Sequence, residues 1–448
     1  MTKYYFIGIG GIGMSGLAKI MTENDFDISG SDPNTNKETR ALETMGVTIN
    51  KEQLADNITS DIDFVVATAA IPDNNPELQK AKSMGLNIIK RPMLLNEIIN
   101  AHKAIAVTGT HGKTTTSSML SEALIAADKD PLVVIGAEVE SIGSNARNGG
   151  GEYSVAEVCE YQRAFFDIHP YAAIITNIDA DHLDCYKDIN DIKMAFKQFV
   201  SQIDPKGFLI YCGDDANTKE IAANYKGHKI SYGFKNTNDY IATDIIIGLI
   251  TTTFKVKQLG DYTLSVPGRH NILNALAVIA AGVETGADKE AVTKSLLDFK
   301  GADRRFQLLG NFKGVPVIDD YAHHPTEVKA TLRAARERYP EKRIVAVFQP
   351  HQHSRTRLLL NDFADAFLDA DKVIMPEIYA VRDTAEDIAS VSSIDVVEKI
   401  NEKYHGKAVY FDSLDGAKKY LLDNTASNDL ILTIGAGPVN KIAQDLLS

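Results

Sequence analysis

The chain has 448 residues, of which 44% are hydrophobic and 24% charged, a composition typical of a globular protein with about three domains. Its net charge of −13 argues against a nucleic-acid partner, because phosphate backbones bind basic surfaces. No apolar run approaches the roughly 18 residues of a membrane-spanning helix, and no secretory signal precedes the first predicted strand. The cysteines Cys159, Cys185 and Cys212 are too few for a disulfide framework, so we expect a cytoplasmic protein.

Short apolar runs alternate with helical patterns along the chain, which predicts an α/β fold with parallel sheets and crossover helices. In the first block, residues 1–102, we predict a strand at Tyr4–Ile9, a glycine loop and a helix from about Gly13. Further strands are predicted at Phe26–Ser29 and Asp63–Thr68.

The second block, residues 103–302, repeats this strand, loop and helix pattern. Its predicted strands are Ala104–Thr108, Ser154–Val158 and Ala172–Asn177, and its predicted helices are Thr114–Ala127 and Asn271–Val283. Residues 228–266 alternate polar and β-branched side chains, which predicts a small antiparallel sheet.

The third block, residues 303–448, again predicts strands with helices between them. These strands are Pro316–Asp320, Arg343–Phe348, Lys372–Pro376, Ala408–Phe411 and Asp429–Ile434. The linkers between blocks are not rich in glycine and serine, so we expect hinged rather than freely moving domains.

The glycine loop, residues Gly8–Gly16, contains five glycines and joins the first predicted strand to the first helix. Together with Asp32 after the second strand, it fits a dinucleotide-binding fingerprint. Any ligand with a pyrophosphate and a ribose fits equally well, although NAD is the default interpretation of this loop alone. Tight packing of helix on strand explains some of these glycines but hardly all of them.

The phosphate loop, residues Gly109–Thr116, also lies between a predicted strand and a helix. Glycines let backbone N–H groups surround phosphate oxygens, and the helix N-terminus favours negative charge. Lys113 can neutralise the terminal phosphates of a nucleotide, and the Thr114 hydroxyl can bind Mg²⁺. Val107 stands where the usual P-loop has its first glycine, so this loop is a shortened relative of that motif. A chance Gly-Lys-Thr run would not explain the flanking strand and helix.

Carboxylates and a histidine follow the next predicted strands of the second block. Glu157 and Glu160 lie at the end of one strand, and Asp179, Asp181 and His182 follow another. Ligands of open α/β sheets collect at the carboxyl ends of strands, so we expect these residues beside the phosphate loop. Mg²⁺ prefers oxygen ligands, which favours a metal site over a structural role.

Four further polar groups have both a structural and a functional interpretation. Asn271 can cap a helix or contact adenine, and Arg304 and Arg305 are either surface charges or a phosphate clamp. The run Asp319–Pro325 has more polar groups than packing can easily satisfy, which favours a site. The run Gln349–Arg357 fits a solvated loop or a site equally well.

In this order, together with Asn145-Ala-Arg147, these motifs resemble those of the Mur ligase family over essentially the whole chain. The resemblance implies an N-terminal Rossmann-like domain that binds UDP-N-acetylmuramate rather than NAD. It further implies a central P-loop-type ATPase domain with a small antiparallel sheet and a C-terminal Rossmann-like domain for the amino acid. The motif order is most similar to members that use ATP to join L-alanine to the lactyl carboxylate through an acyl phosphate, an early cytoplasmic step of peptidoglycan synthesis. It implies a monomer or weak dimer without nucleic-acid or membrane partners.

The same resemblance implies roles for individual residues, with two Mg²⁺ ions held by Thr114, Glu160 and His182. The implied ATP-binding residues are Gly109, Thr110, His111, Gly112, Lys113, Thr114, Thr115, Asn271, Arg305 and Asp320. The implied substrate-binding residues are Gly11, Ile12, Gly13, Met14, Ser15, Asp32, Thr68, Arg91, Tyr321, His323 and Arg355. The implied catalytic residues are Lys113, Glu160, His182, Arg305 and His323.

The chain departs from the family pattern at three positions. Cys159 stands where many members have aspartate, Gln352 where some have arginine, and Pro438 where an acidic residue is common. The change at Gln352 leaves open which residues choose the amino acid.

Three alternatives also remain open. A nicotinamide-dependent nucleotide-sugar oxidoreductase would explain the glycine loop but not the phosphate loop. A non-catalytic nucleotide switch is a second alternative, although the chain lacks an Asn-Lys-x-Asp guanine signature. A ligase of the same family that adds a larger peptide is the third.

Overall fold

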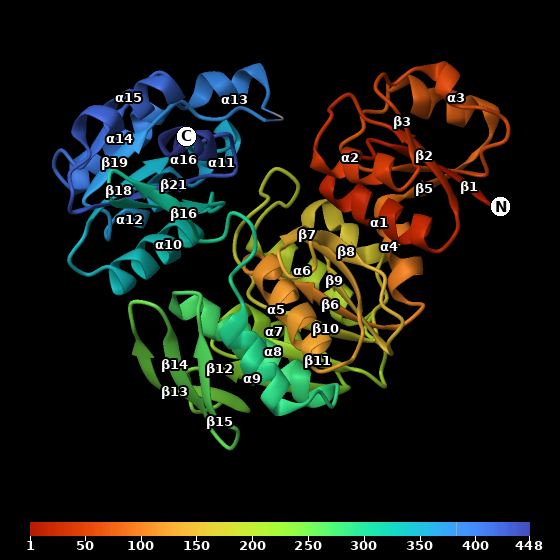
Figure 1. Cartoon of the computed structure of the whole chain (residues 1–448), viewed down its shortest axis with the longest axis horizontal. Coiled ribbons are helices and arrows are strands. Elements are labelled where there is room, and N and C mark those ends of the chain that lie inside the picture. The colour runs from red at the N-terminus through yellow and green to blue at the C-terminus, as the bar shows by residue number, and fades with distance from the viewer. Residues whose placement is uncertain (382) are drawn as a thin grey trace. The chain divides into compact units, whose positions relative to one another are not determined.

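The computed structural model describes residues 1–381 and 383–448, which form α/β sheets with covering helices (Figure 1). The described residues divide into two compact units. The first unit comprises Met1–Ile178, Lys193–Tyr240 and Ala277–Ser295. The second unit comprises Asp179–Ile192, Ile241–Leu276 and Leu296–Ser448. The predicted α/β class is confirmed, whereas the domain ranges 1–102, 103–302 and 303–448 remain predictions.

The N-terminal sheet is parallel throughout and has the strand order β3-β2-β1-β4-β5. Strands extend to both sides of β1, as in a Rossmann-like sheet, and the glycine loop follows β1 at this switch point. The strands are β1 (Lys3–Ile7), β2 (Asp27–Ser31), β3 (Thr48–Asn50), β4 (Phe64–Ala67) and β5 (Asn87–Lys90). The helices are α1 (Ile12–Glu23), α2 (Lys37–Thr44), η1 (Ala55–Asn57), α3 (Pro76–Met84) and α4 (Arg91–Ile99).

The fully buried carboxylate of Glu77 in α3 accepts hydrogen bonds from side chains of both β1 and β2. Its oxygens accept hydrogen bonds from the Tyr5 hydroxyl, the Ser31 hydroxyl and the Asn57 amide at 2.6, 2.6 and 2.7 Å. The carbonyl of Ser31 in turn accepts from the backbone N–H groups of Gly8 and Ile9 at 2.8 and 3.0 Å. Glu77 therefore fixes the end of β2, which in turn holds the glycine loop.

The second sheet of the first unit has the strand order β12-β11-β10-β6-β9-β7-β8. All its pairs are parallel except β7 with β8, so crossover connections dominate, as predicted. The strands are β6 (Lys103–Thr108), β7 (Leu132–Val139), β8 (Ser144–Arg147), β9 (Tyr153–Glu157), β10 (Ala172–Ile175), β11 (Phe208–Cys212) and β12 (His228–Gly233). The helices of this part of the chain are α5 (Lys113–Ala126), η2 (Tyr161–Asp167), α6 (Ile189–Val200), α7 (Ala216–Ala222), α8 (Arg269–Glu284) and α9 (Lys289–Asp298).

The predicted antiparallel region, residues 228–266, needs one correction. Its first strand, β12, pairs in parallel with β11, because Phe208 lies opposite His228 and the register continues in the same direction. Antiparallel pairing begins only with β13 (Tyr240–Ile247), β14 (Thr252–Val256) and β15 (Gly260–Leu264), which form consecutive hairpins.

The C-terminal sheet has the strand order β16-β17-β21-β18-β19-β20 and is parallel except for β16. Residues of this sheet belong to two separate hydrophobic clusters, of which one contains Phe348 and the other Val347. The strands are β16 (Gln307–Phe312), β17 (Val315–Asp320), β18 (Arg343–Phe348), β19 (Lys372–Met375), β20 (Ala408–Tyr410) and β21 (Asp429–Ile434). The helices are α10 (Pro325–Arg338), α11 (His353–Leu358), α12 (Leu360–Ala366), α13 (Ala385–Ser390), α14 (Ser393–Lys403), α15 (Leu414–Asn424) and α16 (Asn440–Leu447).

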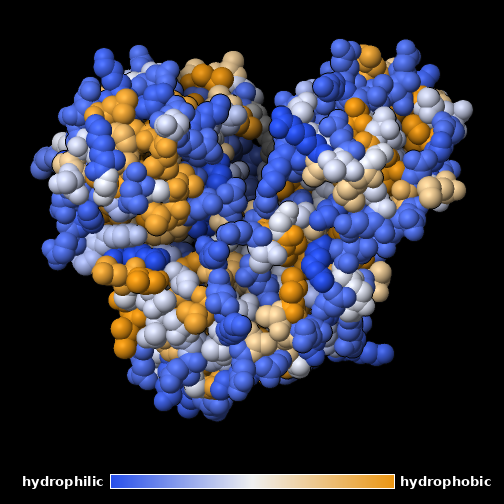
Figure 2. Space-filling view, viewed as in Figure 1, coloured by the Kyte–Doolittle hydropathy of each residue, from blue (hydrophilic) through white to orange (hydrophobic). Residues whose placement is uncertain are grey.

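The surface agrees with the charged composition. On the face shown in Figure 2, hydrophilic residues surround smaller hydrophobic groups. Among the described residues, no helix combines the length and the apolar character that crossing a bilayer requires.

Candidate active site

The phosphate loop between β6 and α5 is held by the residues that follow β10. The N–H groups of Thr110 and His111 donate to the backbone and side-chain oxygens of Asn177, each at 2.9 Å. The Thr176 hydroxyl and the Asn177 amide donate to the His111 carbonyl at 2.6 and 2.9 Å. Gly109 has a φ of +130°, and a Cβ there would lie 2.1 Å from the Thr176 hydroxyl oxygen. The loop conformation therefore requires glycine at position 109.

Lys113, the first residue of α5, forms a buried ion pair with Glu160. Its Nζ lies 3.0 and 2.9 Å from the two carboxylate oxygens of Glu160 and also donates to the carbonyls of Gly109 and Thr110. Burial lowers the pKa of Lys113, but the negative charge of Glu160 outweighs burial and raises that pKa above its ordinary value. Lys113 thus carries a full positive charge at the base of the phosphate loop. Gly112, with a φ of +81°, directly precedes the helix, and Thr115 is buried within it.

Glu157, the last residue of β9, links the phosphate loop to β7. One carboxylate oxygen accepts from the Thr114 hydroxyl at 3.1 Å, and the other accepts from the N–H of Gly136 at 2.9 Å. The sequence analysis expected Glu157 beside the phosphate loop, where it lies, but gave it no individual role. Its signal was available, because β9 was predicted and its last residue had to lie at the same sheet edge as the loop after β6.

A cavity of about 570 Å³ in the first unit is lined by residues of the glycine loop. The predicted substrate residues that line it are Gly11, Ile12, Gly13, Met14, Asp32, Thr68 and Arg91. Glu157 and Cys159 line it as well, so this cavity reaches the carboxylate that binds Thr114. One carboxylate, Glu157, therefore both lines the cavity beside the glycine loop and binds the phosphate loop.

Among the predicted substrate residues of the N-terminal block, Ser15 does not line this cavity. It is buried, its hydroxyl donates to the Ile12 carbonyl at 3.2 Å, and it borders a separate cavity of about 110 Å³. Asp32 lines the large cavity, yet its carboxylate also accepts from the N–H groups of Gly10 and Asn34, each at 2.9 Å. Asp32 therefore holds the glycine loop in addition to facing the cavity.

Arg91 and Cys159 are half-buried ionisable groups in the wall of the large cavity. Burial lowers the pKa of Arg91, although the negative charges near it oppose this shift. Burial and the charge of Glu160 raise the pKa of the Cys159 thiol to about 11. Cys159 is therefore neutral at pH 7, and Arg91 supplies positive charge beside the glycine loop, where a Cβ on Gly13 would lie 3.3 Å from its guanidinium.

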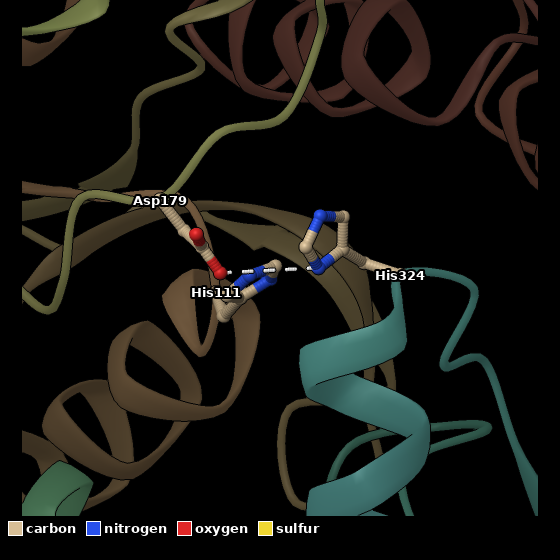
Figure 3. A group of neighbouring side chains, drawn as sticks. All are labelled: His111, Asp179 and His324. Carbon is tan, nitrogen blue, oxygen red and sulfur yellow. Dashed lines mark ion pairs between the residues drawn. The ribbon is translucent and has the colours of Figure 1, made fainter. Parts of the chain in front are cut away.

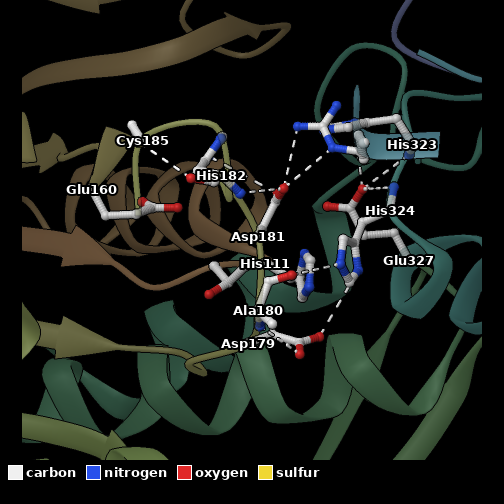
Figure 4. A network of polar contacts seen from close by, with 12 residues as sticks. His111, Glu160, Asp179, Ala180, Asp181, His182, Cys185, His323, His324 and Glu327 are labelled. Atoms are coloured by element: carbon white, nitrogen blue, oxygen red, sulfur yellow. Dashed lines mark hydrogen bonds and ion pairs between the residues drawn. The ribbon is translucent and has the colours of Figure 1, made fainter. Parts of the chain in front are cut away.

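In the second unit, Asp181 forms an ion pair with Arg355. Figure 4 shows Asp181 next to His182 in a network of polar contacts. Two guanidinium nitrogens of Arg355 lie 3.2 Å from one carboxylate oxygen of Asp181, and that same oxygen accepts from the N–H of His182 at 2.7 Å. Burial raises the pKa of Asp181, but the charge of Arg355, together with smaller contributions from neighbouring groups, lowers that pKa well below its usual range. His182 has a φ of +55°, a conformation that costs energy in a residue other than glycine.

Aromatic rings gather next to this pair. The rings of Tyr321 and His323 are 5.6 Å apart, and those of His323 and His351 are 5.9 Å apart. A nitrogen of Arg355 lies 3.2 Å from His351 Nδ1, and the Arg305 guanidinium lies 5.1 Å from the Tyr321 ring centre. Burial lowers the pKa of His323 to about 4, so this ring is neutral at pH 7. The predicted residues Tyr321, His323 and Arg355 therefore form one cluster.

Other polar residues of the second unit have mainly structural contacts. Arg304 binds Asp319 at 2.9 Å and the Gly435 carbonyl at 2.7 Å, so it is neither a surface charge nor a free clamp. Asp320 accepts from the N–H groups of Phe306 and Ala322 at 3.0 and 2.7 Å, and burial raises its pKa to about 6.

Asn271 is not the helix cap that one interpretation suggested. α8 begins at Arg269, and the Asn271 amide donates to the Pro267 carbonyl at 2.7 Å from within the first turn. His324 does cap a helix, since its ring accepts from the N–H of Thr326 at the start of α10. Figure 3 shows His324 beside Asp179, at 3.9 Å, and Asp179 also accepts from the Thr326 hydroxyl at 2.7 Å.

Comparison with known proteins shows the family to which the chain belongs. Mur ligase models match in succession: the catalytic domain of the Mur ligase family at residues 3–103, the middle domain at 107–282, and the glutamate ligase domain at 304–437. The chain belongs to the Mur ligase family.

The chain is similar to curated relatives over its whole length. A UDP-N-acetylmuramate–L-alanine ligase of Caldanaerobacter subterraneus subsp. tengcongensis is 44% identical, over 99% of this chain and 97% of the relative. One of Agathobacter rectalis is 45% identical over the same shares. Among solved structures, the UDP-N-acetylmuramate–alanine ligase of Thermotoga maritima matches with a TM-score of 0.84 and 29% identity, over 100% of this chain and 98% of the other. A murein peptide ligase of Psychrobacter arcticus matches with a TM-score of 0.74 and 25% identity over the same shares.

Proposed function

We propose that this protein joins L-alanine to the lactyl carboxylate of UDP-N-acetylmuramate and converts ATP to ADP and phosphate. The observation that carries the proposal is the position of Glu157, which lines the large cavity and binds Thr114 of the phosphate loop. A sugar nucleotide in the cavity and ATP on the loop would thus meet at one carboxylate. The names of the relatives supply the substrates.

The chemistry requires a carboxylate to attack a phosphate, so two negative groups must approach each other. In the proposed reaction, a lactyl oxygen forms a bond to the γ-phosphorus, and the bond from that phosphorus to ADP breaks. The amine of L-alanine then attacks the acyl phosphate carbon, phosphate leaves, and the amine loses a proton. Lys113 would offset the charge on the phosphates, and Arg355 would bind the carboxylate of L-alanine.

The oxygen atoms near the phosphate loop fit a divalent cation. The Thr114 hydroxyl, Glu157 and Glu160 offer the hard ligands that Mg²⁺ prefers, and we propose that they hold it, with His182 as a ligand of a second ion. Bound there, Mg²⁺ would supply positive charge beside the phosphates. We also propose a cytoplasmic location, since ATP and the sugar nucleotide are needed together.

The decisive experiment measures ADP release with UDP-N-acetylmuramate and a panel of amino acids and short peptides. We expect strong stimulation by L-alanine and weak stimulation by tripeptides. Stimulation by a peptide alone would move the assignment to the peptide-adding members, which the match to a murein peptide ligase makes the second candidate. A change in NADPH absorbance without ADP formation would instead support the oxidoreductase alternative and overturn the proposal.

A further inference from the structure

A short chain of amide hydrogen bonds reaches the wall of the large cavity from the side of α3. Asn75, which precedes α3, is buried, and its side-chain oxygen accepts from the N–H groups of Glu77 and Leu78 at 3.0 and 3.1 Å. Two backbone donors fix that atom as the oxygen, so the other end of the Asn75 amide must be the NH₂ group. This NH₂ group donates to the side-chain oxygen of Gln53 at 2.8 Å.

The same logic fixes the orientation of Gln53. Since its oxygen is turned toward Asn75, its Nε2 is the remaining polar atom of the side chain. Gln53 is half-buried and lines the large cavity, and its Nε2 has no hydrogen-bond acceptor among residues 1–381 and 383–448. The cavity wall therefore presents a hydrogen-bond donor whose direction is set by a helix cap and not by the ligand.

Gln53 occupies a particular place along the sheet edge. It follows β3, the outermost strand next to β2, and β2 ends beside Asp32 (Figure 1). A nucleotide with its pyrophosphate at the glycine loop and its ribose near Asp32 would direct its base toward β3. In a pyrimidine, the group on C4 is opposite the ribose-bearing N1, so this group would be the one that reaches Gln53.

We propose that Gln53 Nε2 donates to the 4-carbonyl oxygen of uracil and thereby selects uracil over cytosine nucleotides. Uracil offers an acceptor at this position, whereas cytosine offers an NH₂ donor that would face another donor. The inference rests on the proposed function, because it assumes a sugar nucleotide in the large cavity. Asn75 acts as a positioning residue, since it sets the orientation of the Gln53 amide without touching the base.

The test compares the binding of UDP and CDP to the full chain by calorimetry. For the unmodified protein we expect UDP to bind at least about ten-fold more tightly, the effect of one well-placed hydrogen bond. Gln53→Glu keeps the shape and the contact with Asn75 but replaces the donor by an acceptor. Because its new charge repels both diphosphates alike, the CDP-to-UDP ratio of dissociation constants reports the base contact, and we expect this ratio to fall to about one or below.

A second variant tests whether Asn75 sets the orientation of the Gln53 amide. Asn75→Asp keeps an equally good helix cap but offers Gln53 an oxygen in place of a donor. The Gln53 amide should then turn over and present its oxygen to the cavity, so the preference for UDP should again be lost by about ten-fold. Gln79→Glu, the same chemical change at an exposed position of α3, is the matched control and should leave the ratio unchanged.

The outcomes separate this inference from the proposed function. Equal affinity of the unmodified protein for UDP and CDP would overturn the role of Gln53. So would an unchanged ratio in both Gln53→Glu and Asn75→Asp, provided that both variants melt as the unmodified protein does. If ADP release with UDP-N-acetylmuramate and L-alanine persists in either case, the proposed function stands and only the base contact fails. Absence of that ADP release would contradict the proposed function instead.

Discussion

The glycine loop and the phosphate loop use the same backbone arrangement in different electrostatic settings. Each follows a buried strand and leads into a helix, β1 to α1 and β6 to α5. The glycine loop contains no charged residue and is held by Ser31 and Asp32 at the end of β2. The phosphate loop contains Lys113, which is paired with Glu160. The comparison indicates that strand, glycine and helix define an anion site, while the charge within the loop determines whether it can also promote a reaction.

Among the predicted changes in the two loops, Lys113→Ala in the phosphate loop should have the largest effect on activity. We predict that kcat for ADP release falls by about 1,000-fold or more, because a buried charge beside the reacting phosphate is lost. Lys19→Ala in α1 is the matched control, because within residues 1–381 and 383–448 Lys19 donates to the Ala146 carbonyl alone, and kcat should stay within a few-fold of normal. Near-normal kcat in Lys113→Ala would mean that the two loops do not differ in function.

The next effect is structural and compares two glycines. Gly109→Ala would place a Cβ against Thr176 at a strained φ, at a cost of about 2–4 kcal/mol in local stability. Gly11→Ala meets its nearest atom only at 3.5 Å and should cost less than about 1 kcal/mol. Hydrogen exchange at the Thr110 and His111 amides measures the first effect, and equal protection in both variants would contradict it.

The third prediction concerns Glu157, which lines the large cavity and binds Thr114. Glu157→Gln should raise KM for both ATP and UDP-N-acetylmuramate, each by about ten-fold. The reason is that this side chain binds Thr114 of the phosphate loop and also lines the large cavity. Asp32→Asn changes the glycine loop and the adjoining cavity wall but no recorded contact of the phosphate loop, so it should raise KM for the sugar nucleotide alone. Steady-state kinetics with each substrate varied decides the matter, and a change in only one KM for Glu157→Gln would refute the shared role.

The smallest effect concerns the support of the glycine loop. Glu77→Gln leaves one of its three side-chain donors facing an NH₂ group, which should weaken the position of Ser31. We predict a KM for UDP-N-acetylmuramate that is about three-fold higher and an unchanged KM for ATP. If both values change equally, Glu77 supports the whole unit and not this loop.

Local patterns predicted the two loops well, because strand, glycine turn and helix are adjacent in sequence. They missed strands such as β3, β5, β7 and β11, of which β3 and β5 are short and only partly buried. The parallel pairing of β12 was also missed, because a strand's own residues do not specify the direction of its partner.

The site was less predictable where a role depends on long-range partners. The sequence does not distinguish the adjacent residues Arg304 and Arg305. Arg304 donates to the carbonyl of Gly435, 131 residues further along the chain, whereas Arg305 lies over the Tyr321 ring. Ser15 is part of the glycine loop, yet it borders the separate, smaller cavity. The role of Glu157 depends on its hydrogen bond from Thr114, which lies 43 residues away in sequence. The roles of the predicted site residues as ligands of ATP, metal and substrate remain predictions.

The Lys113–Glu160 ion pair also affects which anions can compete for the phosphate loop. A small anion such as inorganic phosphate meets a lysine that a buried carboxylate already neutralises. To bind, it must displace that carboxylate, and it gains few backbone contacts in return. A nucleotide triphosphate gains many such contacts along the loop and brings its own cation. We therefore expect this ion pair to oppose the binding of inorganic phosphate, and so to weaken inhibition by one product of the proposed reaction.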